Sequence, residues 1–94
     1  MITHLVMMKF KPETTDAQIA ELESLLKTLP GRIEEIDHYA FGRDVVRSER
    51  SYDFGLVATF ADRNALGRYQ QHPEHLQVVK LLGPICADIK AVDF

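Results

Sequence analysis

Two hydrophobic periodicities alternate along the 94 residues of this chain, and their order leaves few possible folds. A two-residue period places alternate side chains on opposite faces of a strand, whereas steps of three and four residues follow one face of a helix. The two-residue period predicts strands over residues 2–10, 33–42, 52–60 and 85–94.

The first helix has clear start and stop signals. Thr15 and Gln18 have the spacing of a capping box, so we expect the helix to begin after Thr15. Pro30-Gly31 is expected to end it. Leucines at three- and four-residue steps, Leu22 and Leu26 among them, form the stripe that faces the core.

The second helical segment follows Asp62, which offers an N-cap, and is split by Pro73. Leu76, Val79 and Leu82 are the core-facing stripe expected after the split, and Gly83-Pro84 is expected to stop the helix. The predicted order is therefore strand, helix, strand, strand, helix pair and strand.

This order predicts an α+β, ferredoxin-like βαββ(αα)β fold: an antiparallel four-stranded sheet with helices on one face. Residues 1–94 are expected to form this single domain. Leu5, Met7 and Val57 would lie on the other face of the sheet. Because an apolar sheet face is unfavourable in water, we expect two copies to pair through these faces as a homodimer.

Composition restricts the partners and the compartment. The net charge is −3 and the pI about 5.7, so no basic stripe favours nucleic acid or an anionic membrane surface. No apolar run approaches the roughly 20 residues of a membrane span, and no signal peptide pattern is present. The single cysteine, Cys86, permits no internal disulfide and is typical of a reducing, cytoplasmic location. The arginines of the 43–51 loop, Arg47 and Arg50, are expected to be solvated.

Chemically capable side chains are densest in Tyr69-Gln70-Gln71-His72-Pro73-Glu74-His75. If chemistry occurs, His75, with a reference pKa of about 6.5, could take a proton from a carbon next to a carbonyl. Tyr69 could then donate a hydrogen bond to the enolate oxygen. The alternative is structural: Tyr69 and His75 form a buried hydrogen-bonded pair that locks helix to sheet, and His72 ends a helix with its ring bonded to a nearby carbonyl.

The ends of the chain are expected to meet beside this segment. The first and last strands are antiparallel neighbours in this fold, so His4 should lie close to Asp93. A carboxylate fixes the tautomer of a neighbouring imidazole. Both residues share the helix-covered face, so His4, Asp93, Tyr69 and His75 are expected to converge on one internal site. Their spacing matches no metal motif, and we predict no metal.

Six segments spread over nearly the whole chain form an ordered set: His4-Leu5-Val6-Met7-Met8-Lys9-Phe10-Lys11, Gly42-Arg43-Asp44-Val45, Phe60-Ala61-Asp62, Ala65-Leu66, Tyr69-x-x-His72-Pro73-x-His75 and Asp93-Phe94. This set resembles the stress-responsive A/B barrel (Dabb) family. The resemblance implies a dimeric α/β barrel. In plant polyketide cyclases of the olivetolic acid cyclase type, a catalytic tyrosine and histidine match Tyr69 and His75, and a pocket histidine matches His4. Those enzymes carry aromatic residues on the first helix where this chain has leucines.

Three functions remain open at this point. The first is a stress-associated homodimer without turnover, which acts by its own stability or by binding a small hydrophobic molecule between helices and sheet. The second is a cofactor-free cyclase or isomerase that closes a polyketide-like ring in an aldol-type step. The third, from fold analogy, is a cofactor-independent monooxygenase. None of them requires a cofactor. The candidate catalytic residues are Tyr69 and His75, and the candidate substrate-binding residues are His4, Leu22, Leu26, Phe54, Leu56, Ile89 and Asp93.

Overall fold

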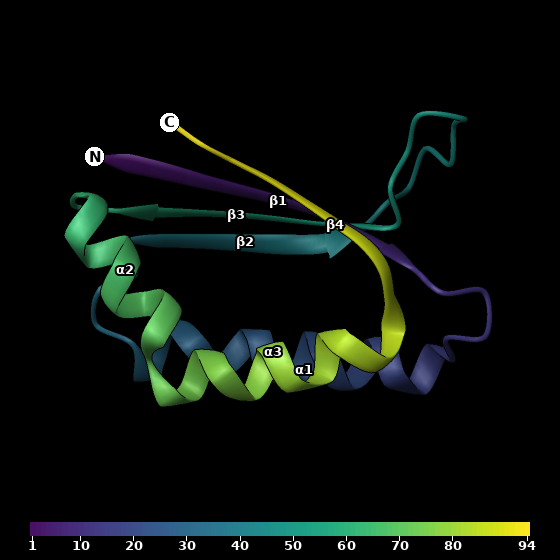
Figure 1. Ribbon diagram of the computed structural model, residues 1–94, viewed down its shortest axis with the longest axis horizontal. Helices are drawn as coiled ribbons and strands as arrows, with labels where there is room; N and C mark the ends of the chain where they lie inside the picture. The colour runs from purple at the N-terminus through teal and green to yellow at the C-terminus, as the bar shows by residue number, and fades with distance from the viewer.

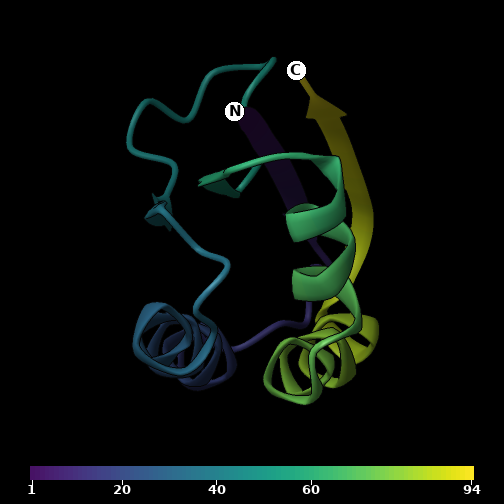
Figure 2. The ribbon, with the colours of Figure 1, turned by 90° about the vertical axis from the view of Figure 1, so that its left-hand side faces the viewer.

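The computed structural model describes all 94 residues and has the predicted ferredoxin-like fold. Four antiparallel strands form one sheet in the order β2-β3-β1-β4, and three helices cover a single face of it (Figures 1 and 2). The elements are β1 (Ile2–Phe10), α1 (Asp16–Arg32), β2 (His38–Arg43), β3 (Phe54–Phe60), α2 (Arg63–Gln71), α3 (Pro73–Ile85) and β4 (Cys86–Asp93).

Helix α1 begins as predicted and ends later than predicted. The Thr15 hydroxyl accepts from the Gln18 N–H at 3.2 Å, and the Gln18 side chain accepts from the Thr15 N–H at 2.9 Å. The prediction that Pro30-Gly31 ends the helix is wrong, because α1 runs to Arg32. Pro30 lies in the last turn and lacks the N–H that would bond the Leu26 carbonyl, but the helix continues past it, and the Ile33 N–H bonds the Leu29 carbonyl at 2.8 Å.

Two strands start later than the alternation predicted. Strand β2 begins at His38 instead of Ile33, because the fully buried Ile33 side chain closes the end of α1. Strand β3 begins at Phe54 instead of Tyr52. The preceding residue, Asp53, has a different role, since its carboxylate accepts the Phe10 N–H at 2.7 Å, where the pairing of β1 with β4 is irregular.

The segment between β2 and β3 leaves the sheet on the side away from the helices (Figure 1). Arg47 and Arg50 are both exposed, as predicted, and Arg47 also forms two ion pairs. That guanidinium lies 2.8 Å from a carboxylate oxygen of Asp53 and 3.6 Å from one of Asp44. These ion pairs close the loop on itself.

Helices α2 and α3 meet at His72, where Pro73 divides them as predicted. Asp62 caps α2 by accepting the Ala65 N–H at 2.8 Å. Gly83-Pro84 does not stop α3, which continues to the buried Ile85. The carbonyl of Ile85 accepts from the Lys11 N–H at 2.7 Å and from the Thr14 hydroxyl at 3.0 Å, and these bonds hold the helix end against the turn after β1.

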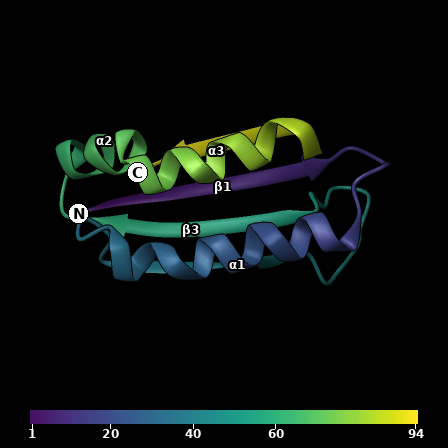
Figure 3. The ribbon, with the colours of Figure 1, turned by 90° about the horizontal axis from the view of Figure 1, so that it is seen from below.

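The face that α3 buries differs in part from the predicted stripe, of which Leu82 packs against the core as expected. Leu76 and Val79 are each 46% exposed, whereas Val78 and Ile85, seven residues apart on one helical face, are buried. The stripe of α1 is as predicted, with Leu22, Leu26 and Leu29 fully buried against the sheet. Seen from below, α1 and α3 run side by side across the sheet (Figure 3).

The sheet face away from the helices carries an apolar patch with no cover in the monomer. Leu5, Met7, Val57 and Val92 are between 36% and 52% exposed there. Leu5 lies in register between Val57 on β3 and Val92 on β4, so these side chains form one continuous surface. We call these four residues the outer patch.

Candidate functional site

A cavity of about 190 Å³ lies between the helices and the inner face of the sheet. Most of its wall is apolar. The lining residues are His4, Val6, Met8, Leu26, Tyr39, Leu56, Tyr69, His75, Val78, Val79, Leu82, Ile89 and Ala91. Val79, Ile89 and Ala91 line the cavity and are also exposed, so its opening lies between α3 and the edge strand β4.

Most of the predicted site residues line this cavity. Both candidate catalytic residues do so, together with His4, Leu26, Leu56 and Ile89. Leu22 and Phe54 do not, because they are core residues, 0% and 2% exposed, that pack elsewhere between the layers. Asp93 is also outside the wall, and its carboxylate is hydrogen-bonded to His4, which lines it.

Tyr69 is the centre of the polar part of the wall. Its side chain is 2% exposed and packs against the rings of Phe60 and His75, with ring centroids 4.8 Å and 4.4 Å away. Its hydroxyl oxygen lies 2.7 Å from that of Tyr39. Burial raises the pKa of the Tyr69 phenol, so this side chain stays protonated and available as a hydrogen-bond donor.

His75 has a defined tautomer. Its Nδ1 lies 3.2 Å from the Gln70 carbonyl oxygen, and a carbonyl can only accept, so Nδ1 carries the hydrogen. In the neutral ring, Nε2 is then an acceptor. Burial lowers the pKa of His75, which favours this neutral form near pH 7. The cavity wall therefore contains an imidazole that can accept a proton beside a phenol that can donate one.

His4 and Asp93 meet as the strand order requires. They are register partners on β1 and β4, and His4 Nδ1 is hydrogen-bonded to the Asp93 carboxylate. The carboxylate accepts the Nδ1 hydrogen, which fixes the orientation of the His4 ring. The ring of His4 also lies edge-on to Tyr69, at 6.3 Å between centroids. Asp93 thus orients His4, and His4 completes the polar end of the cavity.

The remaining histidines have other positions. His72 ends α2 as predicted, but the expectation that its ring bonds a carbonyl is wrong: Nδ1 accepts the Glu74 N–H at 3.1 Å and caps α3. The His38 side chain is 82% exposed on the edge strand. No three His, Cys, Asp or Glu side chains are arranged to hold a metal ion.

Tyr39 is the polar site residue that the sequence analysis did not single out. It lies on β2 and reaches across the layer to Tyr69 on α2. The available signal was its alternation with Phe41, which places both rings on one face of the strand. That signal does not show which helix lies opposite.

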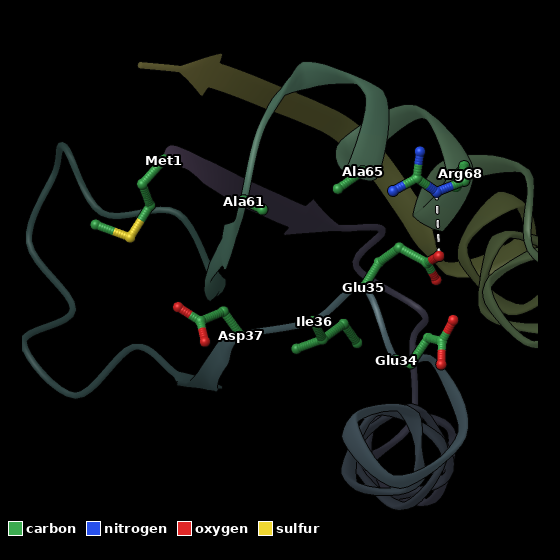
Figure 4. A pocket seen from close by; sticks show the side chains of 8 residues that line it. All are labelled: Met1, Glu34, Glu35, Ile36, Asp37, Ala61, Ala65 and Arg68. Atoms are coloured by element: carbon green, nitrogen blue, oxygen red, sulfur yellow. Dashed lines mark hydrogen bonds and ion pairs between the residues drawn. The ribbon is translucent and has the colours of Figure 1, made fainter.

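A wider hollow at the end of the sheet has a different character (Figure 4). It measures about 490 Å³ and lies open between Met1, the 34–37 segment and α2. Its carboxylates are those of Glu34, Glu35 and Asp37, and the Glu35 carboxylate is paired with Arg68 at 3.1 Å. It contains no neutral donor and acceptor pair comparable to Tyr69 and His75, so the inner cavity is the candidate site.

Comparison with known proteins places this geometry in a family. The family model described as the stress responsive A/B barrel domain matches residues 2–94. A stress-response A/B barrel domain-containing protein of Arabidopsis thaliana is 28% identical over 96 residues. That match includes 100% of this chain but only 36% of the plant protein, so the chain spans about a third of this relative's length.

Two solved structures illustrate the range of similar folds. A dimeric ferredoxin-like protein of unknown function from Thermobifida fusca is 32% identical, with a TM-score of 0.91 over 99% of this chain and 88% of that one. A hydroxynitrile lyase from Passiflora edulis is 18% identical, with a TM-score of 0.86 over 99% of this chain and 90% of that one, and shares the fold. This chain belongs to the stress-responsive A/B barrel (Dabb) domain family.

Proposed function

We propose that this protein is a homodimer that binds a small, largely apolar molecule in the cavity between its helices and sheet. The observation that carries the proposal is the cavity itself, which combines an apolar wall with the four polar rings of His4, Tyr39, Tyr69 and His75. At about 190 Å³ it is somewhat larger than the roughly 150 Å³ apolar cavities that hold benzene. Its size suits a substituted six-membered ring.

The dimer is supported by the outer patch and by a relative. Leu5, Met7, Val57 and Val92 form an exposed apolar surface of the kind that a two-fold axis can cover with itself. The Thermobifida fusca protein, 32% identical, is described as dimeric. Pairing through the outer patch leaves the helix-covered face, and with it the cavity, within each subunit.

Methyl-labelled NMR titration tests the binding proposal with acetophenone and α-methylstyrene as probes. We expect saturable shifts at cavity methyl groups such as Leu26, Leu56 and Val78. The change Ala91→Trp fills the opening and should abolish the shifts, whereas the control Ala20→Trp, on the exposed side of α1, should leave them unchanged. Shifts confined to the outer patch, or equal binding by both variants, would contradict the proposal.

Proton transfer is a second candidate function, favoured by the tautomer of His75. With its hydrogen directed to the Gln70 carbonyl, the ring presents Nε2 as a base, and Tyr69 can stabilise an enolate oxygen. A cyclase or isomerase step of this kind needs no cofactor. The hydroxynitrile lyase supports only the point that an enzyme can be built on this fold. The monooxygenase alternative rests on fold analogy and gains no support from a particular contact.

Hydrogen exchange measures that activity without knowledge of the natural substrate. In D₂O, a base at Nε2 should exchange the methyl hydrogens of acetophenone faster than buffer alone. His75→Ala and Tyr69→Phe should each bring the rate to the buffer value. A wild-type rate equal to that of buffer, or a rate that both substitutions leave intact, would remove the enzyme hypothesis and leave the binding proposal in place.

A further inference from the structure

We propose that Tyr39 and Tyr69 act as a paired phenol donor that selects ligands with a neutral carbonyl or enol oxygen, and that Tyr39 is the positioning residue of the pair. The assignment rests on the proposed binding function of the same cavity. It deepens that function by naming the polar group that the ligand must carry.

The two phenols have one more hydrogen than their mutual hydrogen bond uses. The two hydroxyl oxygens lie 2.7 Å apart, and each phenol has one hydrogen and accepting lone pairs. Their mutual bond uses one hydrogen of the two and is the sole hydrogen bond that either hydroxyl makes to the protein. One O–H donor therefore remains at an apolar cavity wall, where a polar group without a partner is unfavourable. A ligand oxygen that accepts this hydrogen removes the cost.

We assign the remaining donor to Tyr69, because its ring lies against those of His75 and His4 at the polar end of the cavity, with centroids 4.4 Å and 6.3 Å away. Burial raises the pKa of both phenols, and their hydrogen bond then lowers the pKa of Tyr69 while it raises that of Tyr39 further. Both phenols therefore keep their hydrogens, and with Tyr69 as the donor to a ligand it is Tyr39 that donates to the Tyr69 oxygen. The accepted bond polarises the Tyr69 hydroxyl, so Tyr69 becomes the stronger donor toward a third oxygen.

Both phenols are held in place by neighbouring rings. Tyr69 packs against Phe60 and His75, and Tyr39 lies edge-on to Phe41 with 6.2 Å between centroids. The two tyrosine rings are themselves edge-on at 6.2 Å. Because both rings are packed, the positions of the two hydroxyl oxygens are set before a ligand enters, and the free hydrogen can rotate to meet a ligand oxygen.

The same wall excludes a charged acceptor. No lysine or arginine lines the cavity, burial lowers the pKa of His75, and the other imidazole of the wall, His4, is already paired with the Asp93 carboxylate. A carboxylate would lose its hydration without gaining a counter-charge. A neutral ketone, aldehyde or enol gains the hydrogen bond at far smaller desolvation cost, and this is the ligand class that the geometry selects.

Two probes of matched shape isolate the hydrogen bond. Acetophenone carries C=O where α-methylstyrene carries C=CH₂. We expect Tyr69→Phe to raise the Kd of acetophenone roughly 3- to 10-fold and that of α-methylstyrene less than about twofold. Tyr39→Phe should raise the Kd of acetophenone by a smaller factor, and the double variant should add nothing to Tyr69→Phe. Tyr52→Phe is the matched control, because the Tyr52 hydroxyl bonds Asp88 at 2.5 Å and lies outside the cavity wall.

Infrared spectroscopy of ¹³C-carbonyl acetophenone measures the frequency of the bound carbonyl. This frequency would not change between variants if the two tyrosines had only a structural role. The bound carbonyl should absorb at a lower frequency in the wild type than in Tyr69→Phe, with Tyr39→Phe between them. The phenol assignment would be overturned if the two tyrosine variants lost affinity for both probes equally. It would also be overturned if the bound carbonyl absorbed at the same frequency in the wild type and in both variants. In either case the binding function would stand. Binding of neither probe by the wild type would overturn the binding function and this assignment together.

Discussion

The neutral imidazole of His75 links the site to the pH dependence of stability. Burial lowers the pKa of the folded protein's His75 below the unfolded value of about 6.5. Between the two values the unfolded chain binds more protons, so the free energy of unfolding falls as the pH drops through that window. It levels off below the folded pKa.

Two measurements check this prediction. NMR titration of the His75 ring should give a midpoint below about 6.5. Urea unfolding between pH 7 and pH 5 should show a loss of stability in the wild type that His75→Gln reduces. The control is His38→Gln, at a side chain that is 82% exposed. A His75 midpoint above the unfolded value would reverse the sign and disprove the account of this residue.

Residues placed by strand pairing could be predicted from the sequence, and residues placed across layers could not. Antiparallel neighbours fix each other's register, so the position of His4 opposite Asp93 follows once the topology is known. The bond of Tyr39 to Tyr69 depends instead on the height and rotation of α2 above β2, which no local pattern encodes. The same limit explains why Leu22 and Phe54 were assigned to the wall although they fill the core.

At the scale of elements, His72 is the junction on which the shape of the site depends. It ends α2, and its ring accepts the Glu74 N–H at the start of α3, so one residue caps the second helix and brings Tyr69 and His75 together. His72→Ala removes that acceptor and should reduce the free energy of unfolding by about 0.5–2 kcal/mol in urea denaturation. His72→Asn restores a capping group and should recover most of the loss. Equal stability of the alanine variant and the wild type would show that the cap contributes nothing.

Helix starts were predicted well because capping is local chemistry, whereas helix ends were displaced by tertiary contacts. Pro30 and Pro84 both lie in the last turn of a helix, where a proline removes a single bond. Burying Ile33 and Ile85 beyond these prolines outweighs that loss. The stripe of α3 was partly misplaced for a related reason: the rotation of a helix restarted by Pro73 is set by its packing.

The whole molecule is a two-layer domain with an uncovered apolar surface. The order of periodicities was sufficient to predict the topology, because few connections join these elements without crossing. Exposure of Leu5, Met7 and Val57 followed from that topology. None of the three helices has both the length and the apolar composition to cross a bilayer.

A charge within the outer patch should separate the subunits. Val57 lies in the patch and is 38% exposed. We expect the wild type to sediment at about twice the chain mass of 10.7 kDa and Val57→Glu to sediment as a single chain, because burying an unpaired carboxylate is costly. Leu76→Glu, at a leucine of similar exposure on α3, is the matched control and should remain dimeric. A wild type that sediments as a monomer at micromolar concentration would refute the dimer.

Crystals soaked with 4-bromoacetophenone test the ligand site most directly, because the anomalous signal of bromine locates the molecule without prior assumptions. We expect a bromine peak between the helices and the sheet, with the ketone oxygen about 2.5–3.0 Å from the Tyr69 hydroxyl. A peak confined to the outer patch or to the open hollow beside Glu35, with the inner cavity lacking the probe, would contradict it.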